Sequence, residues 1–174
     1  KLLEFMIDEN VKLISATHVP TNSGLVNMVS DLGKIARKHG ILFLVDACQS
    51  VGQMPIDVEE IGCDMLSATS RKYLRGPRGV GFLYVKRSII EKLHPPIVDL
   101  RSATWVSPTV YELRNDAKRF ENWENNCAAI LGFGAAVDYA LEVGLENIKS
   151  RNNELATYLR EKLNLIDGVH IHAI

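Results

Sequence analysis

The sequence predicts an α/β fold built on a mostly parallel sheet, and three observations point to it. Two uninterrupted apolar runs, Ile41 to Val45 and Met65 to Ala68, are typical of strands that are buried on both faces. The segment Val26 to His39 has apolar residues at intervals of three and four, as on one face of a helix. A strand over Val11 to Val19 precedes this helix, and strand, helix, strand is the order of a right-handed βαβ unit.

The remaining long segments are interpreted from the same patterns. A third apolar run, Val80 to Val85, follows a Gly-Pro-Arg-Gly turn and predicts another strand. Small and apolar residues predict a buried helix over Asn126 to Val143, and charges between apolar positions predict a surface helix over Leu145 to Leu165. The segment Val98 to Lys118 has neither period, so we expect an irregular loop of the kind that often contacts a partner.

Shorter elements are predicted at four places. Lys1 to Glu9 reads as the tail of an amphipathic helix, and Asp57 is placed to cap a short helix that ends near Ile61. The pattern Ser88-x-x-Glu91 is that of a capping box. Val169 to Ile174 is expected to begin a strand.

The composition limits the classes of function. The 174 residues are 47% hydrophobic and 24% charged with a net charge of −1, which is ordinary for a globular domain and favours neither nucleic acid nor an anionic membrane as a partner. No apolar stretch approaches the length of a membrane span. The three cysteines, Cys48, Cys63 and Cys127, have no metal-ligand spacing, so we expect reduced thiols in a cytoplasmic protein and no metal.

Two chemically active side chains follow the central strands. Asp46 comes directly after the first apolar run, and Lys72 follows the second after Thr69-Ser70-Arg71. Ligands of open α/β sheets bind outside the carboxyl ends of the strands, so both side chains are expected to project into one crevice. A carboxylate that faces a lysine across such a crevice suits pyridoxal phosphate (PLP).

These residues also carry a family resemblance. VDACQS, followed by TSRKYLRGPRGVGFL, resembles the class V aminotransferase family of fold-type I PLP enzymes, which includes cysteine desulfurases, selenocysteine lyases, isopenicillin N epimerase-like proteins and hercynylcysteine sulfoxide lyase-like proteins. The resemblance covers nearly the whole chain. Its most specific part is Asp46-x-x-Gln49 together with Lys72.

The resemblance implies a three-layer αβα large domain with a mostly parallel sheet, followed by a small C-terminal α/β domain. Residues 1–150 would be the central part of the PLP-binding large domain, and residues 151–174 the start of a truncated small domain. The chain is therefore expected to be a fragment, without the upstream region that stacks an aromatic ring or imidazole on the cofactor. Alone, it is expected to retain the cofactor weakly.

The resemblance also implies roles for named residues. Lys72 would form the internal aldimine, a Schiff base with the cofactor aldehyde, and later move the substrate α-proton. Asp46 would hold a proton on the pyridine nitrogen, and Gln49 would donate to the ring oxygen or stack nearby. In the family an Asn contacts the ring oxygen from the loop after the first strand. Thr21 stands at that position here, with Asn22 beside it.

The phosphate would be bound just before the lysine. Thr69, Ser70 and Arg71 offer hydroxyls and a guanidinium there, and Arg71 stands where the family often has a histidine. Arg75 and Arg78 flank the Gly-Pro turn, where phosphate, substrate carboxylate and solvent are equally open as partners. The glycine spacing of this turn is not the dinucleotide fingerprint.

Two further positions have an ordinary structural explanation. Cys48, between Asp46 and Gln49, is interpreted as a small residue on the buried side of a turn. Arg119-Phe120-Glu121 resembles a family motif near the subunit boundary, but the chain continues with Asn122-Trp123-Glu124, so Trp123 is interpreted as a packing or interface residue.

Two functions of different classes follow. The first is a PLP-dependent enzyme that acts on an amino acid, of the C–S lyase or desulfurase type or a class V aminotransferase, and works as a homodimer. Desulfuration, elimination, transamination and racemisation share their first steps, so all four stay open. The alternative is a non-catalytic fragment or degenerate relative that keeps the fold as a binding or dimerisation module.

Overall fold

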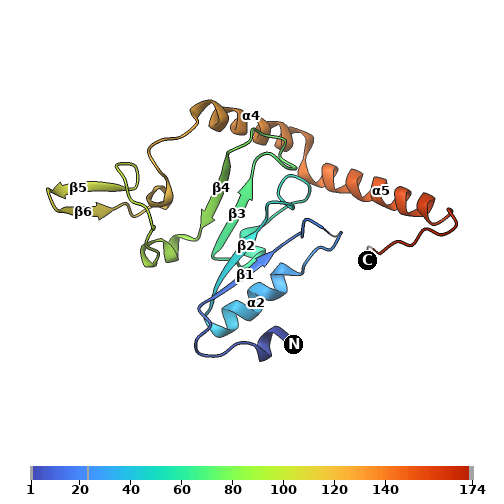
Figure 1. Ribbon diagram of the computed structural model, residues 1–174, viewed down its shortest axis with the longest axis horizontal. Coiled ribbons are helices and arrows are strands. Elements are labelled where there is room, and N and C mark those ends of the chain that lie inside the picture. Colours follow the sequence, from blue (N-terminus) through green and yellow to red (C-terminus); the bar gives the residue numbers. More distant parts are fainter. Residues whose placement is uncertain (1, 23, 173–174) are drawn as a thin grey trace.

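A four-stranded sheet forms the centre of the protein, whose computed structural model describes residues 2–22 and 24–172 (Figure 1). The strand order is β1–β2–β3–β4, and β1, β2 and β3 run parallel while β4 is antiparallel to β3. This confirms the mostly parallel sheet. The strands are β1 Leu13–Thr17, β2 Leu42–Asp46, β3 Met65–Thr69 and β4 Gly81–Val85.

Helix α2, Val29–His39, connects β1 to β2 and packs on one face of the sheet. It ends at Gly40, which has a φ of 65° and donates its N–H to carbonyls of the last turn. The buried side chains Phe43 and Val45 of β2 lie in the same core as the inner face of α2, whereas Leu42 and Leu44, which point to the other face of the sheet, are half-buried.

The short helix α3, Val58–Ile61, begins as predicted at Asp57, whose carboxylate accepts the N–H groups of Glu59 and Glu60. Gly33 of α2 lets the end of this helix approach closely, because a Cβ at Gly33 would lie 1.9 Å from the carbonyl oxygen of Ile61. The contact fixes the segment between β2 and β3 against α2.

The remaining elements lie around this unit. Figure 1 shows the β5–β6 hairpin extending from one end of the molecule and α5 from the other. They are α1 Leu2–Phe5, the 3₁₀ helices η1 Arg87–Lys92 and η2 Ala117–Phe120, the hairpin strands β5 Ala103–Ser107 and β6 Val110–Leu113, and the helices α4 Cys127–Val143 and α5 Leu145–Leu163.

The prediction of an irregular loop over Val98 to Lys118 is wrong, because the segment contains the β5–β6 hairpin. Only Ala103 is buried in the two strands, and side chains on both faces, such as the consecutive residues Thr104 and Trp105, are exposed. A strand pair that buries neither face has no alternation of apolar and polar residues, which is why its period escaped detection.

Helix α4 is also less buried than predicted. Among its described residues only Ala129 and Ala140 are buried, while Leu131 and Leu141 are 77% and 62% exposed. The apolar composition of the helix therefore leaves large side chains at the surface of this chain. Cys127, expected inside, is exposed at the start of the helix.

Three smaller expectations have different outcomes. Ser88 lies inside η1, which follows Lys86 and has no side-chain cap, so the predicted capping box is wrong. Residues 169–172 form no strand, and positions 173 and 174 lie outside the described residues. Helix α5 runs through position 150, and the proposed domain boundary there stays a prediction.

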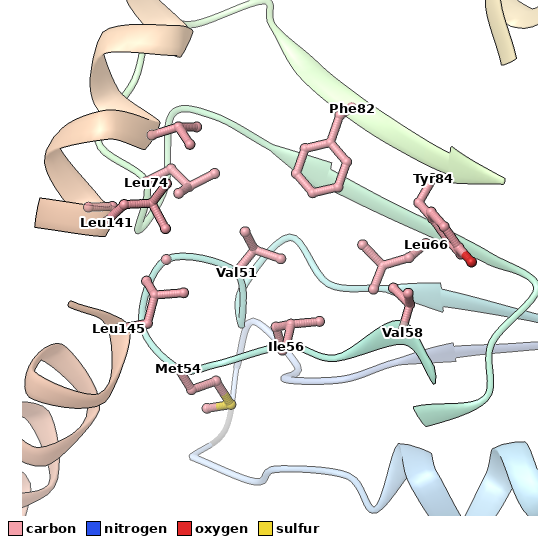
Figure 2. Close-up of a pocket in the computed structure, with 13 residues that line it drawn as sticks. Val51, Met54, Ile56, Val58, Leu66, Leu74, Phe82, Tyr84, Leu141 and Leu145 are labelled. Atoms are coloured by element: carbon pink, nitrogen blue, oxygen red, sulfur yellow. The ribbon is translucent and has the colours of Figure 1, made fainter. Parts of the chain in front are cut away.

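An apolar cavity of about 320 Å³ lies between the sheet and α4 (Figure 2). Figure 2 shows Leu74 and Leu141 at the end of the cavity near α4, and Phe82 and Tyr84 along β4. Its walls come from the segment after β2, from β3 and β4, and from the junction of α4 and α5. They are Val51, Gly52, Met54, Ile56, Val58, Leu66, Leu74, Phe82, Tyr84, Val137, Ala140, Leu141 and Leu145.

Over residues 2–22 and 24–172, no single helix has the length and apolarity of a membrane span. The bent pair α4 and α5, with 73° between them, meets the criterion by length and composition alone.

Candidate active site

Asp46 is the last residue of β2 and lies at the carboxyl edge of the sheet, between two parallel neighbours. The register places it opposite Thr17 of β1 and Ser67 of β3. The backbone continues the pairing by one step, since the N–H of Ala47 donates to the carbonyl of Ser67 at 2.8 Å. The acid is therefore half-buried at the edge where ligands of parallel sheets bind.

The carboxylate of Asp46 is held by its own turn. Its Oδ1 accepts the N–H of Cys48 at 2.9 Å, the geometry of an Asx turn. The carbonyl of Asp46 accepts the N–H of His18 at 2.9 Å, which ties the end of β2 to the residue after β1. These bonds fix the direction of the acid before any ligand arrives.

Lys72 lies on a closed loop between β3 and β4. Ser70 N–H donates to the carbonyl of Val80 at 3.0 Å, and Gly76 N–H returns to the carbonyl of Ser70 at 2.9 Å. Within the loop, Arg75 N–H donates to the carbonyl of Lys72 at 3.0 Å. The lysine is half-buried and is carried by a backbone with several internal hydrogen bonds.

Ser70 closes this loop and is not available to a phosphate, which corrects the sequence-based expectation. Its side chain has no exposed surface, and its hydroxyl donates to the carbonyl of Pro77. Gly76 is needed beside it, because a Cβ there would lie 3.0 Å from the Cβ of Ser70.

The charges of Asp46 and Lys72 both influence the pKa of the Cys48 thiol. Burial raises the pKa of Cys48 most, and a hydrogen bond and the negative charge of Asp46 raise it further. The positive charge of Lys72 and the backbone N–H of Thr69 act in the opposite direction. Groups from the end of β2, the end of β3 and the loop after β3 thus all influence the pKa of this thiol.

Cys48 and Cys63 are not activated as nucleophiles in this arrangement. A raised pKa keeps the Cys48 thiol protonated near neutral pH, in agreement with its interpretation as a small residue in a turn. Burial raises the pKa of Cys63 to about 11, and this residue belongs to the core.

The other predicted residues lie at different depths. Thr69 ends β3 with its hydroxyl 3.5 Å from the carbonyl of Val80, and Gln49 is half-buried with its carbonyl bound by the side chain of Gln53. Thr21 and Arg71 are exposed, and no hydrogen bond of either is seen within the described part of the chain. Their roles stay predictions.

Sequence reasoning gave no role to His18 and Tyr139. His18 is buried, and its Nδ1 has no hydrogen-bond partner among the described residues. Burial lowers the pKa of His18, so the imidazole is neutral near pH 7. The ring of Tyr139 on α4 lies under the guanidinium of Arg75, 4.8 Å from it. A polar residue directly after an apolar strand was the available signal for His18, and none marked Tyr139.

The donor set fits pyridoxal phosphate. A fixed carboxylate at one strand end and an amine on the loop after the next are what the ring nitrogen and the aldehyde require. Hydroxyl and guanidinium groups of Thr69 and Arg71 stand one to three positions before the lysine, as a phosphate requires. Within the described residues, no group of three or more His, Cys, Asp or Glu has a metal-binding arrangement.

Comparison with known proteins gives one consistent result. The sequence profile of the family described as Aminotransferase class-V matches residues 1–173. A probable cysteine desulfurase of Halalkalibacterium halodurans is 33% identical over 178 residues, which cover 98% of this chain and 42% of that protein. A cysteine desulfurase of Haloferax volcanii is 35% identical over 170 residues, which cover 96% of this chain and 39% of that protein.

Solved structures agree with the sequence matches. The apo cysteine desulfurase of Thermococcus onnurineus superposes with a TM-score of 0.82 at 32% identity, over 88% of this chain and 38% of that one. The cystine C–S lyase C-DES, in complex with its product cysteine persulfide, gives a TM-score of 0.90 at 26% identity, over 99% and 47%. The chain thus spans about 40% of the length of its curated relatives.

Proposed function

Because the chain belongs to the class V aminotransferase family, we propose that it is the lysine-bearing part of a PLP enzyme that acts on an amino acid. The family match confirms the predicted resemblance, and the structural matches confirm the fold class and pyridoxal phosphate as the cofactor. The favoured reaction is cleavage at a carbon–sulfur bond. The cysteine desulfurases and the cystine C–S lyase among the relatives support it.

One observation carries the proposal: Asp46 at the end of β2 and Lys72 on the loop after the neighbouring parallel strand β3 lie at the same edge of the sheet. This is the edge at which ligands of parallel sheets bind. The charges of the two side chains also shift the pKa of Cys48 in opposite directions.

Lys72 and Asp46 have different roles in the proposed reaction. When bound, the cofactor supplies an electron sink for the bond that breaks. Lys72 Nζ would hold the cofactor and would serve as the base for the α-proton of the substrate. The Asp46 carboxylate would accept a hydrogen bond from the ring nitrogen and favour its protonated form.

Four other residues complete the proposed site. Gln49 donates from the turn that follows Asp46, and Thr21 contacts the ring oxygen from the loop after β1. Thr69 and Arg71 bind the phosphate, for which a hydroxyl and a planar guanidinium are suitable donors.

A labelling experiment tests the proposal. The chain is mixed with pyridoxal phosphate, reduced with borohydride and digested, and the modified lysine is located by mass spectrometry. We expect the adduct on Lys72 in the unmodified chain. The yield of this adduct should be lower in Asp46→Asn, and Lys72→Ala should have no adduct at position 72. Lys86→Ala is the matched control, since Lys86 is also half-buried but follows β4 at the opposite edge.

Two results would count against the enzyme. Label spread evenly over the surface lysines would mean that Lys72 has no special environment. Absence of any label in a full-length protein would favour the alternative, a non-catalytic relative that keeps the fold for binding or dimerisation.

A homodimer is part of the same proposal. Four large apolar side chains of the β5–β6 hairpin are 49 to 61% exposed, and a second copy would cover them: Trp105, Val106, Val110 and Tyr111. A two-stranded hairpin is marginally stable alone, which favours a covered state. A monomeric mass by light scattering at high concentration would contradict it.

We also propose a cytoplasmic location, because the three cysteines are free thiols, as a reducing compartment keeps them. Disulfide-linked protein in a cell extract protected from oxidation, seen on a non-reducing gel, would contradict this.

A further inference from the structure

Helix α4 contacts the loop that carries Lys72 at two points. A Cβ at Gly132 would lie 2.9 Å from Cγ of Pro77, so this glycine lets the loop approach the helix axis. Seven positions further, the ring of Tyr139 lies under the guanidinium of Arg75, with 4.8 Å from the guanidinium carbon to the ring centroid. Seven residues are about two helical turns, so both contacts lie on one face of α4.

Arg75 has a disfavoured backbone conformation. Its φ is 60°, and within the described residues it is the one position other than glycine with a positive φ. A long side chain is held in this left-handed region where its surroundings determine it, and such positions are common at functional sites. Here the surroundings are the Tyr139 ring on one side and the hydrogen bond from Arg75 N–H to the carbonyl of Lys72 on the other.

The turn after β2 holds the opposite side of the loop. A Cβ at Gly52 would lie 2.6 Å from the backbone of Tyr73 and Leu74, so the two backbones are in close contact. Leu74 is buried against the apolar cavity, while Lys72 two positions earlier is half-buried at the site. The loop between β3 and β4, which carries Lys72, is thus packed between the segment that follows Asp46 and helix α4.

We propose that the contact of Arg75 with Tyr139 is a positioning contact that directs Lys72 toward Asp46. This inference rests on the proposed function of Lys72. Arg75 acts through the backbone, because its N–H donates to the carbonyl of Lys72 and the side chain anchors this end of the turn on Tyr139. Its guanidinium lies over an aromatic face in this structure, as a positioning contact requires.

Four variants test the aromatic ring and the cation of this contact separately. Tyr139→Phe keeps the aromatic face and Tyr139→Leu removes it. Arg75→Lys keeps a cation at the same backbone conformation, and Arg75→Gly removes the side chain while glycine accepts the positive φ without strain. Arg75→Gly therefore provides a variant that folds even where Tyr139→Leu does not.

The readout is the rate at which pyridoxal phosphate and borohydride label Lys72, divided by the rate at Lys86 in the same sample. We expect Tyr139→Phe and Arg75→Lys to stay within a factor of two of the unmodified chain. Tyr139→Leu and Arg75→Gly are expected to lower the ratio roughly two- to fivefold, the factor that corresponds to an exposed cation–π contact. General unfolding would expose all lysines alike and would not lower one of them selectively.

The outcomes are distinguishable. A ratio in Arg75→Gly equal to that of Arg75→Lys overturns the positioning role, as does a loss in Tyr139→Phe as large as in Tyr139→Leu. Failure of the unmodified chain to label Lys72 in preference to Lys86 overturns the proposed function itself.

Discussion

Replacing Gly52 by alanine tests whether the turn after β2 supports the lysine loop. Gly52 has a φ of 91°, and a Cβ there would lie 2.6 Å from the backbone of both Tyr73 and Leu74. The loop has to move by about 0.8 Å before these contacts reach the 3.4 Å of ordinary van der Waals contact. Both atoms are backbone atoms, so no side-chain rotation can relieve the overlap.

The expected cost has two parts. The left-handed backbone costs an alanine roughly 1–2 kcal/mol. Forcing the packed loop outward adds about 1–3 kcal/mol, as for other overpacked sites. In a catalytically competent protein, a shift of Lys72 near 1 Å would also lower the rate on the order of 100-fold.

Gly40→Ala is the matched control. Gly40 has a φ of 65°, and a Cβ there meets nothing within 4 Å, so this variant has the backbone strain without the contact. Urea unfolding gives the free energy of both variants, and borohydride labelling reports on Lys72. We expect Gly52→Ala to be the less stable of the two by about 1–3 kcal/mol and to label Lys72 more slowly. Equal stability and equal labelling of the two variants would refute the reasoning.

Three other perturbations have defined outcomes. Asp46→Asn removes a negative charge and a hydrogen bond that raise the pKa of Cys48, so iodoacetamide should alkylate this thiol several-fold faster at pH 8. An unchanged alkylation rate would mean that Asp46 does not influence the Cys48 thiol. Cys63 has a pKa raised from 9.0 to about 11 by burial, so the folded state binds its proton more tightly than the unfolded state, and the stability that this supplies is lost as pH rises from about 9 to 11. Cys63→Ala should flatten the stability curve in that window, whereas Cys127→Ala, at an exposed position, should not. Trp105→Ser should shift the proposed dimer toward monomer in light scattering at a given concentration, and an unaltered mass would remove the hairpin from the interface.

The buried strands and the first helix could be predicted because burial imposes a pattern on the sequence. Phe43 and Val45 are buried on one face of β2 and Leu42 and Leu44 are half-buried on the other, which gives an unbroken apolar run, and Gly40 ends α2 in the conformation that a glycine favours. The β5–β6 hairpin has no such sequence pattern, because neither of its faces is buried against another part of the described chain.

The centre of the candidate site was predictable, and its supports were not. Asp46 and Lys72 stand out because acid and amine directly follow apolar strands. The contact between Arg75 and Tyr139 joins residues 64 positions apart, and neither residue type suggests the other. Ser70 was misassigned because a hydroxyl before a lysine looks the same in sequence whether it faces a ligand or a carbonyl.

The strand order has a practical consequence for handling the protein. Strands β1 and β4 form the two margins of the sheet, and within the described residues each pairs with one neighbour only. The unpaired backbone donors and acceptors of an edge strand can pair with a further strand, so we expect open-ended self-assembly in concentrated solutions of this chain if these edges stay uncovered. Growth of that kind increases without limit with concentration, whereas a closed pair of molecules reaches a plateau, and a dilution series tells the two apart.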